Sequence, residues 1–112
     1  MAITNQNQVS FHEATLVAIS RSKGRISLSL EDVLIFGTRT SVDVSINNVD
    51  VVLRNDLVVE SVEMEEDDGE VLGILQQEGQ IVLIVQWNNF SDKTRSIVTY
   101  KFCGERVVVH VG

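Results

Sequence analysis

The sequence has no proline, a single cysteine, no long apolar run, and only four phenylalanines, one tyrosine and one tryptophan. The single cysteine excludes an internal disulfide, so a reducing cytoplasm is the expected location. No segment approaches the roughly eighteen apolar residues of a membrane-spanning helix, which excludes that class of protein. The few aromatic side chains argue against a lectin-like stacking platform.

Catalytic motifs are missing as well. The sequence contains neither Gly-x-Ser-x-Gly, nor Gly-x-Gly-x-x-Gly, nor Gly-x-x-x-x-Gly-Lys. Cys103 and His110 lie seven positions apart in a predicted strand hairpin, and an odd separation places them on opposite faces. His12 and His110 would approach each other, near Glu13, if the first and last strands pair. Two histidines without further ligands at motif spacing are a weak indication of a zinc site. We therefore predict a non-enzymatic protein without a metal or cofactor.

The net charge of −7 is concentrated in one segment. Residues 60–70 hold seven acidic side chains and no basic one, and the other nine acids match the nine Lys and Arg of the chain. An acidic protein repels phosphate backbones and anionic lipid surfaces. Neither nucleic acid nor a membrane is therefore an expected partner.

Alternation of apolar and polar residues is the main positive signal. It predicts half-buried strands at residues 26–30 and 42–46. Ile81–Trp87 is the most uniformly apolar run of the chain and is rich in β-branched residues, which predicts a strand buried on both faces. With 112 residues, the chain is long enough for one core. The predicted fold is a single-domain antiparallel β-sandwich or flattened barrel of about nine strands, rich in meanders, over residues 9–112. Residues 1–8 are predicted to be a flexible tail.

Several local features of this fold can be predicted. Residues 9–20 form one long first strand, a turn follows at Gly24, Glu31–Asp32 marks a bulge, and residues 57–64 form another strand. Asn47–Asn48 fits a two-residue hairpin turn that would place Ile46 opposite Val49.

The last two hairpins are predicted in the same way. A turn at Cys103–Gly104 would pair residues 98–102 with the chain end, which is long enough to pair with the first strand as well. Residues 71–76 are expected to pair with 81–87 across Glu78–Gly79, and both faces of this hairpin are apolar. Because no amphipathic helix is predicted, another sheet or a second subunit must cover one face, so we expect a homo-oligomer.

The candidate binding site combines the acidic run with the end of the apolar strand. Three interpretations of the acidic run at residues 60–70 are open: a solvated loop, a docking surface for a basic protein, or a Ca²⁺ site that lacks the spacing of an EF-hand. Two interpretations of Trp87 are open: it anchors a partner, or it closes the end of the core. The candidate partner-binding residues are Glu63, Glu65, Glu66, Asp67, Asp68, Glu70, Trp87 and Phe90.

Two short segments resemble a known family. Phe11-His12-Glu13-Ala14 near the start, and Tyr100-Lys101-Phe102 before a valine-rich end, are similar to small bacterial β proteins that open with Phe-His-Asp-Ala. These include the immunity proteins of polymorphic toxin systems in the family numbered fifty. Glu13 departs from that pattern, which has aspartate. The resemblance implies a cytosolic, non-enzymatic protein that neutralises a toxin by binding it, and it assigns no binding residues.

The sequence thus favours a cytoplasmic binding module that docks a basic protein partner through its acidic loop. The alternative is a small-ligand-binding β-barrel with an interior lined by Leu83, Val85 and Val107.

Overall fold

The computed structural model describes residues 9–112, and all regular secondary structure in this range is β-strand. The predicted all-β antiparallel fold is confirmed, with ten strands where about nine were expected. Residues 1–8, predicted to be a tail, lie outside the described range. The strands are β1 (Val9–Ser10), β2 (Thr15–Ser22), β3 (Arg25–Ile35), β4 (Thr38–Asn47), β5 (Val51–Arg54), β6 (Leu57–Val59), β7 (Asp68–Gln77), β8 (Gln80–Asn89), β9 (Thr94–Cys103) and β10 (Val108–Val111).

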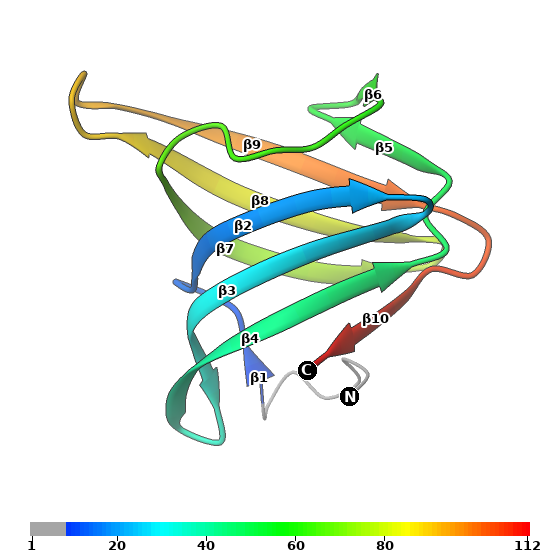
Figure 1. Ribbon diagram of the computed structural model, residues 1–112, viewed down its shortest axis with the longest axis horizontal. Coiled ribbons are helices and arrows are strands. Elements are labelled where there is room, and N and C mark those ends of the chain that lie inside the picture. The colour runs from blue at the N-terminus through cyan, green and yellow to red at the C-terminus, as the bar shows by residue number, and fades with distance from the viewer. Residues whose placement is uncertain (1–8) are drawn as a thin grey trace.

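The strands form one sheet in the order β10-β4-β3-β2-β7-β8-β9-β5-β6, and β1 adds beside β3. β2, β3 and β4 make one meander and β7, β8 and β9 make another (Figure 1). Only two residue pairs join these meanders, Thr15 with Glu70 and Leu16 with Gly69. The strands thus form a single open sheet with two meanders, and the predicted sandwich or barrel is not confirmed. In this range no helix is long and apolar enough to cross a membrane.

The side chains of both meanders meet in one core cluster. The alternating residues of β3 and β4 point into this core as predicted: Leu28 and Val44 are each only 1% exposed. β8 supplies every second residue to the core, ending with Trp87 at 1% exposed. The prediction that β8 is buried on both faces is only partly right, because Val82 is buried on the other face but Ile84 is partly exposed.

Tight turns fix the hairpins. Lys23–Gly24 and Phe36–Gly37 have both central residues at positive φ, as does Asn55–Asp56, which is the backbone pattern of type I′ hairpin turns. The predicted turn at Gly24 is confirmed, and Gly24 has φ +78°. The predicted bulge is confirmed too, since the register between β3 and β4 shifts between Leu30 and Val33.

The predicted hairpin at Asn47–Asn48 is wrong. The chain leaves β4 there and crosses to β5, which pairs with β9 and β6, while Ile46 lies opposite Ile26 and Val109. Contacts with distant segments decide this path. The Asn48 amide Nδ2 donates to the Arg106 carbonyl at 3.0 Å, and a Cβ added at Gly104 would lie 2.1 Å from the Asn48 carbonyl oxygen.

Three other strand predictions are corrected. The first strand is broken by a turn in which the Ala14 amide donates to the Phe11 carbonyl, with Glu13 at φ +67°. The chain end pairs with β4, not with β9 or the first strand. The expected strand 57–64 stops at Val59.

The β7–β8 register is right from the turn as far as Gly73 opposite Ile84. Beyond that pair a bulge moves Val71 opposite Val85. The physical cause is the turn after β1: the Glu13 amide donates to the Val71 carbonyl, and the Val71 amide donates to the Ala14 carbonyl.

Candidate functional site

The segment from Glu60 to Asp67, here called the strap, links β6 to β7 and carries most of the acidic run (Figure 1). Its apolar side chains face inward: Val62 is 9% exposed, and Met64 packs against the core. The guanidinium of Arg21 on β2 donates to the Glu60 carbonyl at 3.0 Å and fixes the start of the strap. Glu63 therefore faces solvent, whereas Glu65 turns toward the sheet.

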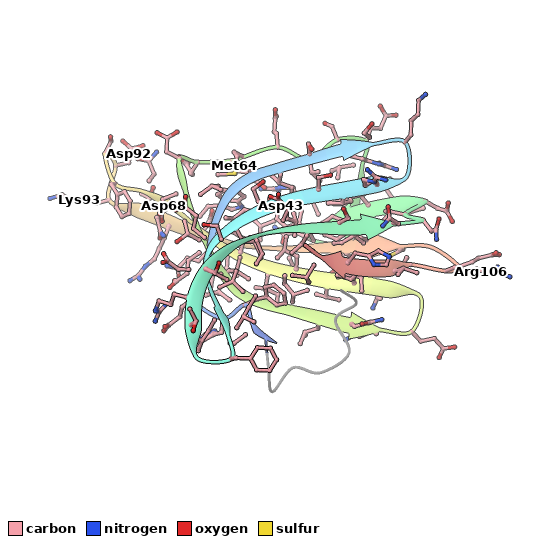
Figure 2. The ribbon with its side chains drawn as sticks, turned by 60° about the horizontal axis from the view of Figure 1, so that its bottom comes forward. Asp43, Met64, Asp68, Asp92, Lys93 and Arg106 are labelled. Carbon is pink, nitrogen blue, oxygen red and sulfur yellow. The ribbon has the colours of Figure 1, made fainter. Side chains whose placement is uncertain are left out.

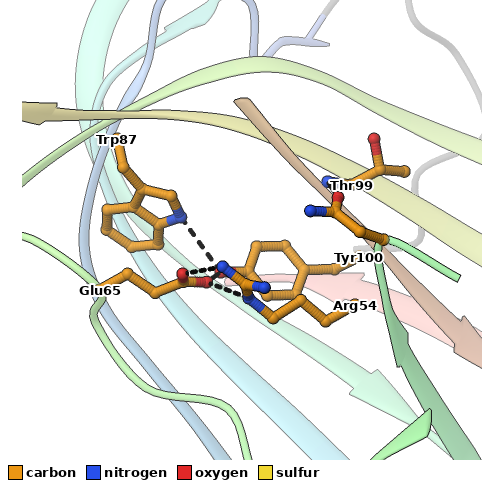
Figure 3. Close-up of polar contacts among 6 residues, drawn as sticks. Arg54, Glu65, Trp87, Thr99 and Tyr100 are labelled. Carbon is orange, nitrogen blue, oxygen red and sulfur yellow. Dashed lines mark hydrogen bonds and ion pairs between the residues drawn. The ribbon is translucent and has the colours of Figure 1, made fainter. Parts of the chain in front are cut away.

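Glu65 is the centre of a polar network that fastens the strap to β5 and β9 (Figure 3). The Arg54 guanidinium donates to both carboxylate oxygens, from Nε at 3.0 Å and from Nη2 at 2.5 Å. The Tyr100 hydroxyl donates to Glu65 Oε2 and accepts a hydrogen bond from Trp87 Nε1 at 3.1 Å. The Glu65 carboxylate thus joins the strap to β5 and β9, and Tyr100 extends the network to β8.

The network sets the charge state of its members. Burial disfavours the ionised form of Glu65 and would raise its pKa. The hydrogen bonds from Arg54 and Tyr100 outweigh this effect and keep the Glu65 pKa below its ordinary value. Burial, reinforced by the neighbouring carboxylate, raises the Tyr100 pKa above its ordinary value. The hydrogen bond to Glu65 also raises the Arg54 pKa. Glu65 therefore stays ionised and Tyr100 stays neutral at physiological pH, which suits a structural fastening and not proton transfer.

The acidic candidate residues other than Glu65 form a surface that is here called the acidic surface. Within residues 9–112 none of them forms an ion pair with a basic side chain. Asp68 accepts a hydrogen bond from the Asn88 amide at 2.6 Å, so its carboxylate is held beside the end of β8. Figure 2 shows Asp68 at the same end of the molecule as Asp92 and Lys93. The acidic surface consists of Glu63, Glu66, Asp67, Asp68 and Glu70.

The two candidate aromatic residues have different environments. Phe90 is 75% exposed in the turn between β8 and β9, and this turn adjoins the acidic surface because Asp68 pairs with Asn88. Trp87 is 1% exposed and its ring packs on Gly69 of β7. Of the two alternatives for Trp87, the structure has the one in which it closes the end of the core. Only Phe90 is available to a partner.

The pockets of the described chain are open to solvent. One of about 200 Å³ lies between the strap and the sheet, lined by Arg54, Ser61, Val62, Glu63, Glu65 and Tyr100. One of about 420 Å³ lies at the turn between β2 and β3, lined by Ser22, Lys23, Gly24, Arg25, Ser27, Asn47 and Asn48. The residues expected to line a ligand cavity are used in packing: Leu83 and Val85 belong to the core cluster, and Val107 packs against it.

The candidate catalytic and metal-binding residues are not brought together. His12 Nδ1 lies 3.1 Å from the Leu72 carbonyl oxygen, whereas His110 lies opposite Ser45 in the pairing of β10 with β4. The Cys103 thiol instead lies 3.8 Å from the Gln80 side-chain oxygen. In the part of the chain that the structure describes, no group of three or more His, Cys, Asp or Glu side chains is placed to hold a metal ion.

The Phe11–Ala14 motif makes a corner of the fold. Phe11 and Ala14 are buried at 6% and 0% exposed, and the backbone of this turn bonds to Val71. Comparison of the chain with protein-family models, with curated proteins and with solved structures found no match. The resemblance of this motif to immunity proteins therefore stays a prediction.

Arg54 and Tyr100 were not predicted as members of the site. Arg54 lies eleven positions before Glu65 and reaches it only after the β5–β6 hairpin and the strap fold back. The sequence contains one usable signal: Arg54 is the last basic residue before the acidic run, and the next one is Lys93.

Proposed function

We propose that this protein is a cytoplasmic, non-enzymatic binding module that takes up a basic protein partner on its acidic surface, with Phe90 as an apolar anchor. The observation that carries the proposal is the juxtaposition of carboxylates that have no ion-pair partner within residues 9–112 and a phenylalanine that is 75% exposed. Clustered charge of one sign steers an oppositely charged protein and speeds encounter. A neighbouring exposed aromatic side chain supplies area that is lost to water on docking.

Glu65 is excluded from the docking set because it is committed to Arg54 and Tyr100. Glu63 and Asp67 are fully available and Glu66 is partly so. A partner would therefore meet the outer side of the strap, while the inner side of the strap stays attached to the sheet.

A finer version of the proposal is that the partner is a toxin that this protein neutralises. It rests on the resemblance of residues 11–14 to the immunity family. Since Phe11 and Ala14 are buried in a corner of the core, these two would support the fold, whereas His12 and Glu13 are exposed. The small-ligand alternative gains no such support, because Leu83 and Val85 are packed in the core.

The test compares two triple charge reversals. The first places lysine at Glu63, Glu66 and Asp67 and leaves Glu65 intact. The control places lysine at three exposed acids outside the acidic surface, Glu31, Glu78 and Glu105. Both variants change the net charge equally, so nonspecific charge effects cancel.

Immobilised wild-type protein and both variants are exposed to lysate of the native cell, and bound proteins are identified by mass spectrometry. We expect a basic protein that binds the wild type and the control but not the first variant, and Phe90→Ala should weaken its capture. Thermal melting verifies that each variant is folded. Equal capture by the two triple variants would overturn the proposal. For the finer version, the captured protein must be toxic when expressed alone and harmless when co-expressed with this chain.

A further inference from the structure

The side of β8 that faces away from the core carries a second apolar cluster. Val82 is 6% exposed, and it is the one buried apolar residue of the described chain that does not belong to the core cluster. Its neighbours follow from the strand pairing: Leu75 lies beside it on β7 and Lys101 on β9. Beyond Lys101 the same row continues through Leu53 on β5 to Val58 on β6.

Further apolar residues extend this row along the strands. Ile84 lies between Gly73 and Thr99, and Ile97 lies opposite Gln86. A Cβ added at Gly73 would meet no atom within 4 Å, so the surface is open there. Together these residues are here called the outer patch: Leu53, Val58, Leu75, Val82, Ile84 and Ile97.

Three of the six residues of the outer patch are exposed. Leu75, Ile97 and Val58 remain 43%, 58% and 72% exposed. A contiguous exposed apolar surface on a soluble protein commonly marks an interaction site. The one charge in the central row, on Lys101, is neutralised by Asp56 at 2.8 Å. The patch therefore offers no net charge that would select a charged partner.

We propose that the outer patch packs against the outer patch of a second copy of this chain. An uncharged apolar face is matched best by another uncharged apolar face, and each copy presents an identical one, as a two-fold symmetric contact requires. The size is suitable: β7, β8 and β9 have ten residues each, β5 has four and β6 has three. With a strand spacing of about 4.8 Å and a rise of about 3.3 Å per residue, they span roughly 600 Å². That area is at the lower end of what one partner loses in a standard interface.

Electrostatics selects the direction of the two-fold axis. Asp68 and Glu70 project on this side of β7, alternating with Gly69, which faces Trp87 in the core. Arg95 projects on the same side of β9, opposite Asn88, so this end of the face is charged. The opposite end of the face carries uncharged Gln77 and Gln80. An axis running across the strands places the charged end of each copy over the uncharged end of the other. An axis parallel to the strands, along the central β9, would instead place Arg95 of one copy over Arg95 of the other, so the first arrangement is favoured.

Sedimentation of the full chain over roughly 1 to 100 μM tests the dimer. The matched variants are Leu75→Asp, in the outer patch, and Val17→Asp on β2, because both side chains are 43% exposed. We expect a dimer for the wild type and Val17→Asp. Leu75→Asp should weaken the dimer at least about a hundredfold, because it buries an unpaired charge in the contact. Ile97→Asp should act in the same direction.

The outcomes that overturn the proposal are equally definite. A wild-type monomer throughout the concentration range would do so, and so would a dimer that survives both Leu75→Asp and Ile97→Asp. A loss of dimer affinity in Val17→Asp equal to that in Leu75→Asp would also overturn the proposal. The single cysteine, Cys103, lies at the Gln80 end of the face and allows a spin-label distance measurement. The favoured axis predicts roughly 25–30 Å between the two labelled backbones, and about 15 Å would contradict that orientation.

Discussion

Trp87 packs directly on Gly69 of the neighbouring strand: a Cβ added at Gly69 would lie 2.9 Å from Cζ3 of the indole. The indole is 1% exposed and tied to Tyr100, so it has little room to move away. We therefore expect Gly69→Ala to destabilise the protein by about 1–3 kcal/mol, as overpacked core substitutions do. Urea denaturation followed by tryptophan fluorescence would measure the loss, since Trp87 is the sole tryptophan.

The control is Gly73→Ala on the same strand. A Cβ at Gly73 meets no atom within 4 Å, and its backbone is not among those with positive φ. This substitution should leave the free energy of unfolding unchanged or raise it slightly, because alanine restricts the unfolded chain. Equal losses at both glycines would show that the Trp87 contact is not the cause.

Glu65→Gln should destabilise the protein in a pH-dependent way. The Glu65 pKa is held below its ordinary value of 4.5, so the ionised carboxylate contributes stability above that value. As the pH falls through the lowered pKa of the folded state, this contribution is lost. We expect a difference between wild type and variant of about 1–2 kcal/mol at neutral pH. The difference should shrink as the pH falls from about 5 to about 3.

Urea titrations at a series of pH values would measure this convergence. Glu63→Gln is the matched control, because Glu63 is exposed and forms no ion pair with a described side chain. It should leave stability unchanged at every pH. A Glu65→Gln protein as stable as the wild type at neutral pH would mean that the Arg54 contact contributes nothing.

Tyr100 is the sole tyrosine, so ultraviolet absorbance at high pH reports on it alone. Burial, followed by the hydrogen bond to the Glu65 carboxylate, raises its pKa above the ordinary value of 10.0. The phenolate should therefore appear only well above pH 10 while circular dichroism still shows a folded protein. In Glu65→Gln the midpoint should fall, since the carboxylate contribution is gone. A wild-type midpoint near 10 would mean that the hydroxyl is not buried in the network.

The core could be predicted from the sequence because burial follows a local period. Residues such as Leu28 and Val44 alternate with polar neighbours, and no distant information is needed to orient them. Pairing partners are different. A valine-rich strand can pair with any other, so the pattern alone could not show that Ile46 pairs with Val109 and not with Val49.

The candidate site was predictable in part for the same reason. The acidic run is visible as composition, and its solvated side chains Glu63 and Asp67 are where charge alone would place them. The separate role of Glu65 depends on a hairpin that returns the strap over Arg54, a relationship between distant segments. Likewise the bulge at Val71 arises from hydrogen bonds to the turn after β1, which no pattern within β7 records.

Phe36 occupies a turn position that its residue type does not favour. Its φ is +48°, and its side chain is 72% exposed, so packing within the described chain does little to offset the conformational strain. Asparagine is well suited to this position of a type I′ turn. Phe36→Asn should therefore stabilise the protein by about 0.5–1 kcal/mol, measured as a higher urea midpoint with an unchanged slope.

Lys23 provides the comparison, since it occupies the corresponding turn position at φ +42° and is also exposed. Lys23→Asn should give a gain of similar sign. If Phe36→Asn destabilised the protein while Lys23→Asn stabilised it, the phenyl ring would have to make a contact that offsets its strain. A stability gain at both positions would show that the ring is dispensable for folding. Phe36 would then occupy a strained position without stabilising the folded chain, which is a feature typical of functional positions.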